Sequence, residues 1–312
     1  MHPALSVIFF STLSGAGFGL WAWLGLRIAV GDGPRAFQSL AWSLLLVAGG
    51  IAAAVGLLAS FWHLGKPLRA WRALSQWRTS WLSREGVLAA ASFVPAAGLL
   101  WLLREGAPGL SAAARLMGLA LALLSLATVV STAMIYAALK PIPAWRHRLV
   151  PPVYLLFALL TGGLPMLGSI GRGGDGVDAA LPSLLIAIGL ALLLAKLAYW
   201  RDIDRTPLPQ TRGDAIGLPG RTPTVFERPH TEGNFITREM AFAVARRHAR
   251  LLRVAAVLLF AVVPLLCLVG GLRQPGGDAW PWPLATGSAI AGAFIERWLF
   301  FAQARHLVTL YY

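Results

Sequence analysis

The sequence predicts an all-α polytopic membrane protein, a bundle of eight transmembrane helices. Of its 312 residues, 57% are hydrophobic and only 13% are charged, about half the charged share of an ordinary soluble domain. The mean hydropathy is +0.66. The apolar residues come in long runs instead of recurring at the spacing of one helix face, and runs of about 18 or more are long enough to cross a bilayer.

Eight such runs are expected to span the membrane as one domain covering residues 1–312. Each is long enough to cross a core of ~30 Å at a helical rise of about 1.5 Å per residue. Prolines flank most of the runs, whereas Pro95, Pro165 and Pro264 fall inside spans and predict kinks. The expected spans are residues 4–30, 37–62, 86–103, 113–138, 151–170, 181–200, 252–272 and 284–308.

Basic residues divide unequally between the two sides that eight spans would create. The second, fourth and sixth loops hold five, three and ten Lys and Arg residues, whereas the odd-numbered loops together hold six. Because positive charge stays on the cytoplasmic side, both termini and the even-numbered loops are expected there. The net charge of +14 thus reflects topology, and no basic groove motif supports nucleic-acid binding. The first run has no basic segment before it and reaches Val30, so we expect a retained helix instead of a signal peptide.

The sixth loop, residues 201–250, is the largest extramembrane segment. Its first part, from Asp202 to Asn234, is rich in Pro, Gly and Thr and cannot form a core of its own. A loop of this length predicts docking on a partner subunit. The following stretch, Thr237–Arg253, mixes apolar residues with arginines. It indicates either an amphipathic helix at the membrane surface or a plain extension of span seven.

The connection between spans two and three is the densest polar region, with one His, one Glu, five cations and several Trp. His63 ends span two and Glu85 begins span three, with Ser83 as a candidate cap, so both lie at one membrane face. A His–carboxylate pair at this depth can hydrogen-bond a quinone carbonyl and exchange protons with water. The alternative is that both residues satisfy only local backbone and headgroups. The candidate binding residues are His63, Arg69, Trp81, Arg84 and Glu85.

Haem is the main rival cofactor. A transmembrane b-type haem requires two histidines on facing helices within the bilayer. All six histidines map to the cytoplasmic edge or its loops, which excludes a haem ladder across the membrane but leaves open a single haem between His63 and His306. The single cysteine, Cys267, provides neither a disulfide nor a metal site on this chain. The histidines are His2, His63, His147, His230, His248 and His306.

Glu296 and Arg297 lie inside the last span. Charges within a membrane face the protein interior and usually pair. As direct neighbours they point about 100° apart on a helix, so each is expected to pair with another helix, with Lys196 the candidate partner for Glu296. A structural ion pair is favoured over a proton path. A transporter is disfavoured because no internal repeat or paired broken helices are visible.

Several segments together resemble the membrane-anchor subunits of molybdenum oxidoreductases of the dimethyl-sulfoxide-reductase type. The resemblance implies eight helices, no haem, an iron–sulfur partner subunit, a catalytic subunit with the molybdopterin centre, and a quinone pocket near the docking face. It maps the pocket's His and Glu onto His63 and Glu85. The matching segments are 2–4, 14–17, 63–67, 76–78, 83–85, 229–232, 238–240, 246–249 and 296–301.

Orientation separates the branches of this family. The arginine-rich face carries His63 and Glu85 and is expected to be cytoplasmic, which is similar to the anchor of the cytoplasmic sulfite dehydrogenase. The expected function is therefore passage of electrons from sulfite oxidation to ubiquinone or menaquinone in a bacterial inner membrane, by a subunit without the catalytic centre. The alternatives are the anchor of a dimethyl-sulfoxide or related reductase fed by menaquinol, and a non-redox scaffold or transporter.

Overall fold

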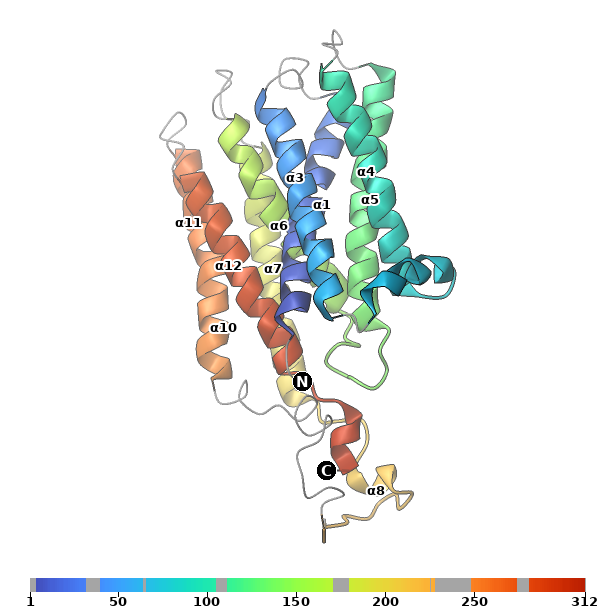
Figure 1. Cartoon of the computed structure of the whole chain (residues 1–312). Helices are drawn as coiled ribbons and strands as arrows, with labels where there is room; N and C mark the ends of the chain where they lie inside the picture. Colours follow the sequence, from blue (N-terminus) through green and yellow to red (C-terminus); the bar gives the residue numbers. More distant parts are fainter. Residues whose placement is uncertain are drawn as a thin grey trace.

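The protein is a bundle of long, nearly parallel helices (Figure 1). The computed structural model describes residues 4–31, 40–63, 66–104, 111–170, 180–224, 226–227, 248–273 and 281–311. Within these ranges every regular element is helical. The predicted all-α membrane fold is therefore confirmed.

The first half of the sequence forms four long helices and two short 3-10 helices. The long helices are α1 (Leu5–Val30), α3 (Leu40–Ala59), α4 (Trp81–Arg104) and α5 (Ala112–Ala137). Between α3 and α4 the backbone forms η1 (Ser60–His63) and η2 (Pro67–Gln76). Span three thus begins five residues earlier than predicted, because η2 ends the loop and α4 starts directly after Ser80.

The second half begins with α6 (Val150–Ile170) and α7 (Ala180–Arg205), followed by the short α8 (Arg212–Ala215). Next comes one continuous helical span made of α10 (Ala249–Val257), the π turn η4 (Leu258–Val262) and α11 (Val263–Arg273). The last long helix is α12 (Pro281–Ala302), and η5 (Leu307–Tyr311) follows it. The predicted last span, 284–308, was wrong at its end, because the helix stops at Ala302.

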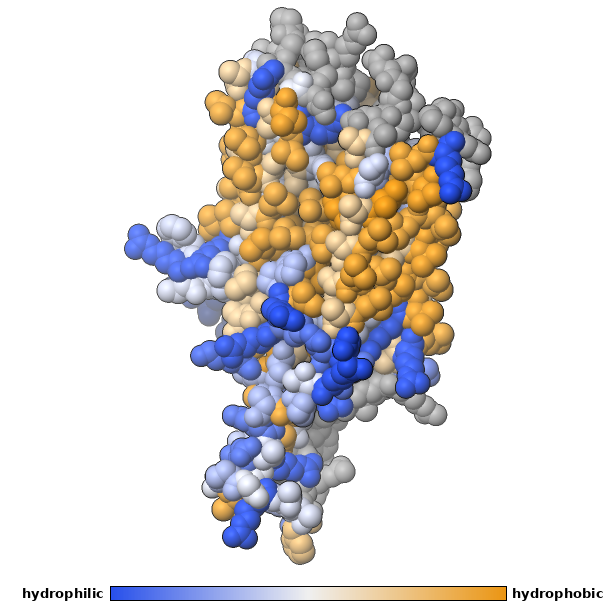
Figure 2. Space-filling model, turned by 180° about the vertical axis from the view of Figure 1, so that it is seen from behind, coloured by the Kyte–Doolittle hydropathy of each residue, from blue (hydrophilic) through white to orange (hydrophobic). Residues whose placement is uncertain are grey.

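Seven described segments are long and apolar enough to cross a membrane. The eighth long helix, α12, has 22 residues and lies in the same bundle, but it carries Glu296 and Arg297. Figure 2 shows an apolar surface over the middle of the bundle, with hydrophilic residues gathered toward the end that holds α8. The protein is therefore a multi-pass membrane protein.

The two ends of the bundle differ in the way the charges predict. The N-terminus, the C-terminus, α8, η2 and the connection from α5 to α6 all lie at one end, which we call the basic end (Figure 1). This arrangement requires an even number of spans. That the basic end faces the cytoplasm stays a prediction. Residues 228–247, most of the expected amphipathic helix and the second part of the docking loop, lie outside the described residues.

Helix α1 is at the centre of the bundle and packs through glycine. A Cβ at Gly19 would overlap the carbonyl oxygen of Ala158 in α6, and a Cβ at Gly17 would overlap the backbone of Gly49 and Ala53 in α3. Small residues allow this close approach of helix backbones in lipid. The predicted tight packing of Gly17 and Gly49 is confirmed, whereas Gly15 was wrongly included, because a Cβ there would meet no atom within 4 Å.

The π turn in the seventh span has a local cause. Pro264 has no N–H, so a carbonyl one turn before it loses its helical partner and the helix widens at Leu258–Val262. The carbonyl of Leu259 accepts a hydrogen bond from Ser288 Oγ of α12 at 2.7 Å. The predicted kink at Pro264 thus takes the form of a π turn whose freed backbone is satisfied by a neighbouring helix.

Substitution of Gly19 tests this packing. We expect Gly19→Val to destabilise the protein by about 3 kcal/mol or more, because the side chain forces α1 away from α6. Thermal unfolding of the purified protein, followed by size-exclusion fluorescence, measures the effect. Gly287→Val is the matched control, since a Cβ at that position meets nothing within 4 Å. Equal unfolding midpoints for the two variants would contradict the packing argument.

Candidate functional site

Glu85 lies in the second turn of α4 and points into the bundle. Its side chain is 3% exposed, and Thr132 Oγ1 of α5 donates a hydrogen bond to its Oε1. The expectation that Glu85 lies in the first turn was wrong, because α4 begins at Trp81. The carboxyl group is therefore shielded from water and held by a neutral hydroxyl.

The predicted cap of α4 was also wrong. Ser83 is buried inside the helix, and its Oγ has no hydrogen-bond partner in the described part of the protein. Ser80 takes the capping position, since its Oγ accepts a hydrogen bond of 3.4 Å from the Ser83 N–H. A serine directly before the first helical residue is the usual arrangement.

Helix η2 forms an arm that projects sideways from α4 at the basic end (Figure 1). Apolar side chains on it are exposed, with Leu68 92% and Trp71 67% accessible. Leu74 packs on Gly86, where an added Cβ would lie 2.9 Å from a Leu74 methyl carbon. The arm therefore lies beside the residue that follows Glu85. Arg69 is exposed on the same arm.

Arg84 fastens the end of the arm to α4. Its Nε donates to the carbonyl of Trp77 at 3.0 Å, and its Nη2 donates to the carbonyl of Arg78 at 2.6 Å. The guanidinium also stacks over Trp81, 4.3 Å from the ring centre. Of the sequence candidates, the structure thus brings Trp81, Arg84 and Glu85 into one helix turn. Contact of Arg84 with a ligand stays a prediction.

The backbone of His63 ends η1, as expected for the end of span two. Its side chain lies outside what the structure describes. The pairing of His63 with Glu85 therefore stays a prediction.

A second group of charges is buried among α7, α12 and α6. Lys196 Nζ lies 2.5 Å from Glu296 Oε1, which confirms the predicted pair. Arg297 Nη1 lies 3.1 Å from Glu296 Oε2, so the expectation that the neighbours Glu296 and Arg297 pair only with other helices was wrong. All three side chains are at most 3% exposed. We call these residues the Lys196–Glu296–Arg297 cluster.

Aromatic rings surround the two cations of this cluster. Lys196 Nζ lies 4.2 Å from the ring centre of Tyr199 and 4.7 Å from that of Trp200. The Arg297 guanidinium lies 3.5 Å from the ring centre of Tyr154. Because one carboxylate serves two cations, these ring faces help to stabilise the remaining positive charge.

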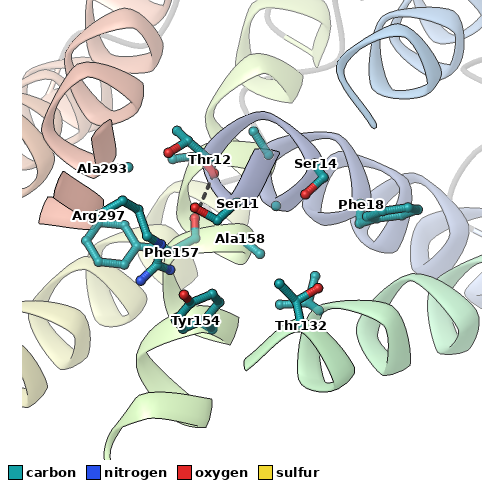
Figure 3. Close-up of a pocket in the computed structure, with 14 residues that line it drawn as sticks. Ser11, Thr12, Ser14, Phe18, Thr132, Tyr154, Phe157, Ala158, Ala293 and Arg297 are labelled. Carbon is teal, nitrogen blue, oxygen red and sulfur yellow. Dashed lines mark hydrogen bonds between the residues drawn. The ribbon is translucent and has the colours of Figure 1, made fainter. Parts of the chain in front are cut away.

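A narrow cavity of about 10 Å³ adjoins the cluster (Figure 3). The side chains around it belong to α1, α5, α6 and α12, and Arg297 points toward Tyr154 within it. This site was not predicted from the sequence. Its only signal was the set of hydroxyl residues inside apolar runs. The polar residues that line it are Ser11, Thr12, Ser14, Thr132, Tyr154, Thr161 and Arg297.

Two histidines outside the spans have local partners. His147 Nε2 lies 3.3 Å from Asp202 Oδ2, and His306 Nδ1 accepts a hydrogen bond of 3.0 Å from the Val308 N–H. Burial lowers the pKa of both rings, an effect that Asp202 opposes at His147. Among the described residues, no group of three or more His, Cys, Asp and Glu is arranged to hold a metal ion.

Comparison with known proteins places this arrangement. A family model described as the DMSO reductase anchor subunit (DmsC) matches residues 1–198, more than half of the sequence. The protein belongs to this family. The match includes α1 to α6 and the Glu85 site, so the sequence resemblance is confirmed over the part that carries it.

Two relatives of the anchor are informative. The protein is 36% identical to a sulfite dehydrogenase subunit of Allochromatium vinosum, over 330 positions that cover 100% of its own length and 99% of the relative. It is 30% identical to a component of the anaerobic dimethyl sulfoxide reductase of Escherichia coli over 141 positions, which are 45% of its own length and 48% of that relative. Both relatives are parts of oxidoreductases by name.

Removing the carboxylate of the buried cluster tests its role in stability. Glu296→Gln leaves Lys196 and Arg297 as two uncompensated buried charges, so we expect a loss of about 3 kcal/mol or more. The double variant Lys196→Met/Glu296→Gln removes one of those charges and should regain part of the loss. Unfolding midpoints of the purified anchor measure both. A single variant as stable as the wild type would refute the ion-pair assignment.

The Arg84 contacts can be tested by proteolysis. Arg84→Lys keeps the charge but loses the two-pronged guanidinium that holds the carbonyls of Trp77 and Arg78. A loss of about 1 kcal/mol should raise the rate of tryptic cleavage after Arg78 about fivefold. Arg72→Lys is the matched control, because Arg72 only lies 5.6 Å from the ring centre of Trp71 on the exposed arm. Equal cleavage rates in the two variants would show that Arg84 does not hold the arm.

Proposed function

We propose that this anchor is the quinone-reactive subunit of a molybdenum sulfite dehydrogenase complex. It would receive electrons from an iron–sulfur subunit that docks at the basic end and pass them to a quinone beside His63 and Glu85. The observation that carries the proposal is the position of Glu85. Its carboxyl group is buried, is hydrogen-bonded to Thr132, and adjoins an exposed apolar arm.

The chemistry of the proposed site is balanced by two half-reactions. Sulfite and water give sulfate, two protons and two electrons on the catalytic partner. A quinone that takes up two electrons and two protons becomes a quinol. The anchor must therefore bring protons to the quinone as well as hold it. A carboxyl group shielded from bulk water is a suitable final proton donor.

The surroundings of Glu85 suit an apolar substrate that arrives from lipid. The cavity of about 10 Å³ next to Thr132 is too small for a quinone ring. We therefore place the quinone head between η1, the arm and the start of α4, with His63 and Glu85 as hydrogen-bonding groups. Trp81 offers an aromatic face, and Arg69 offers a cation to the quinone head or to an acidic partner.

Partners and location follow from the family and the charge pattern. The name of the Allochromatium vinosum relative supports assembly with iron–sulfur and molybdopterin subunits. The arginine-rich loop 201–250 is proposed to dock the iron–sulfur subunit. We propose a bacterial inner membrane with the termini and the Glu85 face in the cytoplasm.

An anchor of a dimethyl-sulfoxide reductase is the second candidate, favoured by the Escherichia coli relative. In that case electrons would run from menaquinol to the catalytic partner. The purified complex separates the two: reduction of decylubiquinone with sulfite supports the first, whereas only quinol-driven dimethyl-sulfoxide reduction would establish the second. A scaffold without a redox site would show neither quinone reaction.

Variants of the two site residues test the proposal in the whole complex. We expect His63→Ala and Glu85→Gln to lower the rate of decylubiquinone reduction at least tenfold, because each removes a group that binds or protonates the quinone. Sulfite-dependent ferricyanide reduction by the catalytic partner should stay unchanged. Wild-type quinone rates in both variants would overturn the site assignment.

A further inference from the structure

Two hydroxyl groups in the cavity beside Arg297 have no protein partner. Within the described part of the protein, Thr12 Oγ1 and Tyr154 Oη make no hydrogen bond, although both residues are at most 5% exposed. Buried polar groups are almost always hydrogen-bonded to protein or to water. The cavity of about 10 Å³ is just large enough for one water molecule. Both hydroxyls line it, which makes it a polar site built for a bound water.

This cavity connects the two sites of buried acid groups. Thr132 lines it on one side and donates its hydroxyl hydrogen to Glu85. Arg297 lines it on the other side and donates to Glu296 (Figure 3). Glu85 and Glu296 thus lie at opposite ends of one line of hydroxyl and charged groups that crosses the bundle.

The line continues beyond Glu296 toward the basic end. Glu296 accepts a hydrogen bond from Lys196 at 2.5 Å. A second narrow cavity is lined by Lys196, Glu296, Tyr199 and Leu149. Tyr199 contacts the ring of His147, with ring centres 5.2 Å apart. Buried groups therefore extend from Glu85 to the surface connection between α5 and α6.

His147 opens onto a wide, charged vestibule. The vestibule has a volume of about 680 Å³ and is lined by charged groups from α7, α10 and the segments beside them, including Asp202, Asp204 and Arg253. His147 Nδ1 accepts a hydrogen bond of 3.2 Å from the Leu149 N–H, so its other nitrogen holds the ring proton toward Asp202. The ring is thus arranged to exchange a proton with water at the vestibule.

From this arrangement we propose that the vestibule, the Lys196–Glu296–Arg297 cluster and the Thr12–Tyr154 cavity form a proton path that crosses the bundle and ends at Glu85. The inference rests on the proposed function, because the protons would serve quinone reduction. Protons enter from water at His147 and are handed along carboxyl, amino and hydroxyl groups. Each group releases one proton as it receives another, and two passages supply one quinol.

A proton path of this kind explains why water and quinone approach from different sides. The arm is the lipid-side approach to Glu85, whereas the vestibule lies below α7 and α10. A purely structural cluster would need its ion pairs but not the two unpartnered hydroxyls beside them. The hydroxyls are therefore the groups to change.

Three variants interrupt the path without removing a charge. Gly15→Val fills the cavity, because Gly15 lines it and a Cβ there meets no atom within 4 Å. Thr12→Val and Tyr154→Phe remove the two hydroxyls, a nearly neutral change for the fold because neither has a protein partner. The matched controls are Gly287→Val and Ser125→Ala. Gly287 lies in α12 with open space around it, and Ser125 is a buried, unpartnered hydroxyl outside this cavity.

The experiment measures sulfite-to-decylubiquinone activity of the whole complex in lipid nanodiscs, in H₂O and in D₂O. We expect each path variant to lower the quinone rate at least fivefold and to raise the solvent isotope effect. The KM for decylubiquinone and the ferricyanide rate should stay at wild-type values. The controls should match the wild type in every measurement.

The outcomes separate this inference from the proposed function. Wild-type quinone rates and isotope effects in Thr12→Val and Tyr154→Phe would overturn the proton path, even if Gly15→Val fails to fold. If His63→Ala and Glu85→Gln then still lose quinone reduction, the proposed function stands without the path. If those two variants retain quinone reduction, the proposed function itself falls.

Discussion

Direct contact between the backbones of α1 and its neighbours is the interaction on which the other features of the bundle depend. In lipid there is no water to drive helices together, so association relies on close van der Waals packing. Gly17 and Gly19 let α1 approach α3 and α6 until no side chain fits between them. This places the hydroxyl residues of α1 at the centre of the protein, opposite Tyr154 and Arg297. The polar cavity is therefore a result of where the tightest contacts lie.

Much of the fold could be predicted because bilayer thickness and charge bias act on composition alone. The Lys196–Glu296 pair was also predictable, since few buried charges were available to pair. The depth of Glu85 was not, because the end of the loop depends on where η2 packs, and that is set by the contact of Leu74 with Gly86. The cavity was missed for a related reason: a serine or threonine in an apolar run shows its neighbours only once helices are assembled.

The distribution of polar groups also separates two solvents around one site. On the side of the arm, exposed Leu68 and Trp71 suit the boundary between headgroups and acyl chains. On the side of the vestibule, Asp204 and Arg253 form an ion pair of 2.6 Å at the edge of a charged hollow. The same end of the bundle thus offers an apolar approach and an aqueous approach, some helices apart, to groups buried between them.

The π turn at Leu258–Val262 links two positions that are distant in the sequence. Pro264 frees a backbone carbonyl, and Ser288 on the neighbouring helix donates a hydrogen bond to the carbonyl of Leu259 in this turn. A relative that replaced the proline by a residue with an N–H could close the helix again, and its serine would then lose its acceptor. Conversely, loss of the serine alone would leave a bare carbonyl within the membrane. Over evolutionary time the two residues should be inherited, and exchanged, together.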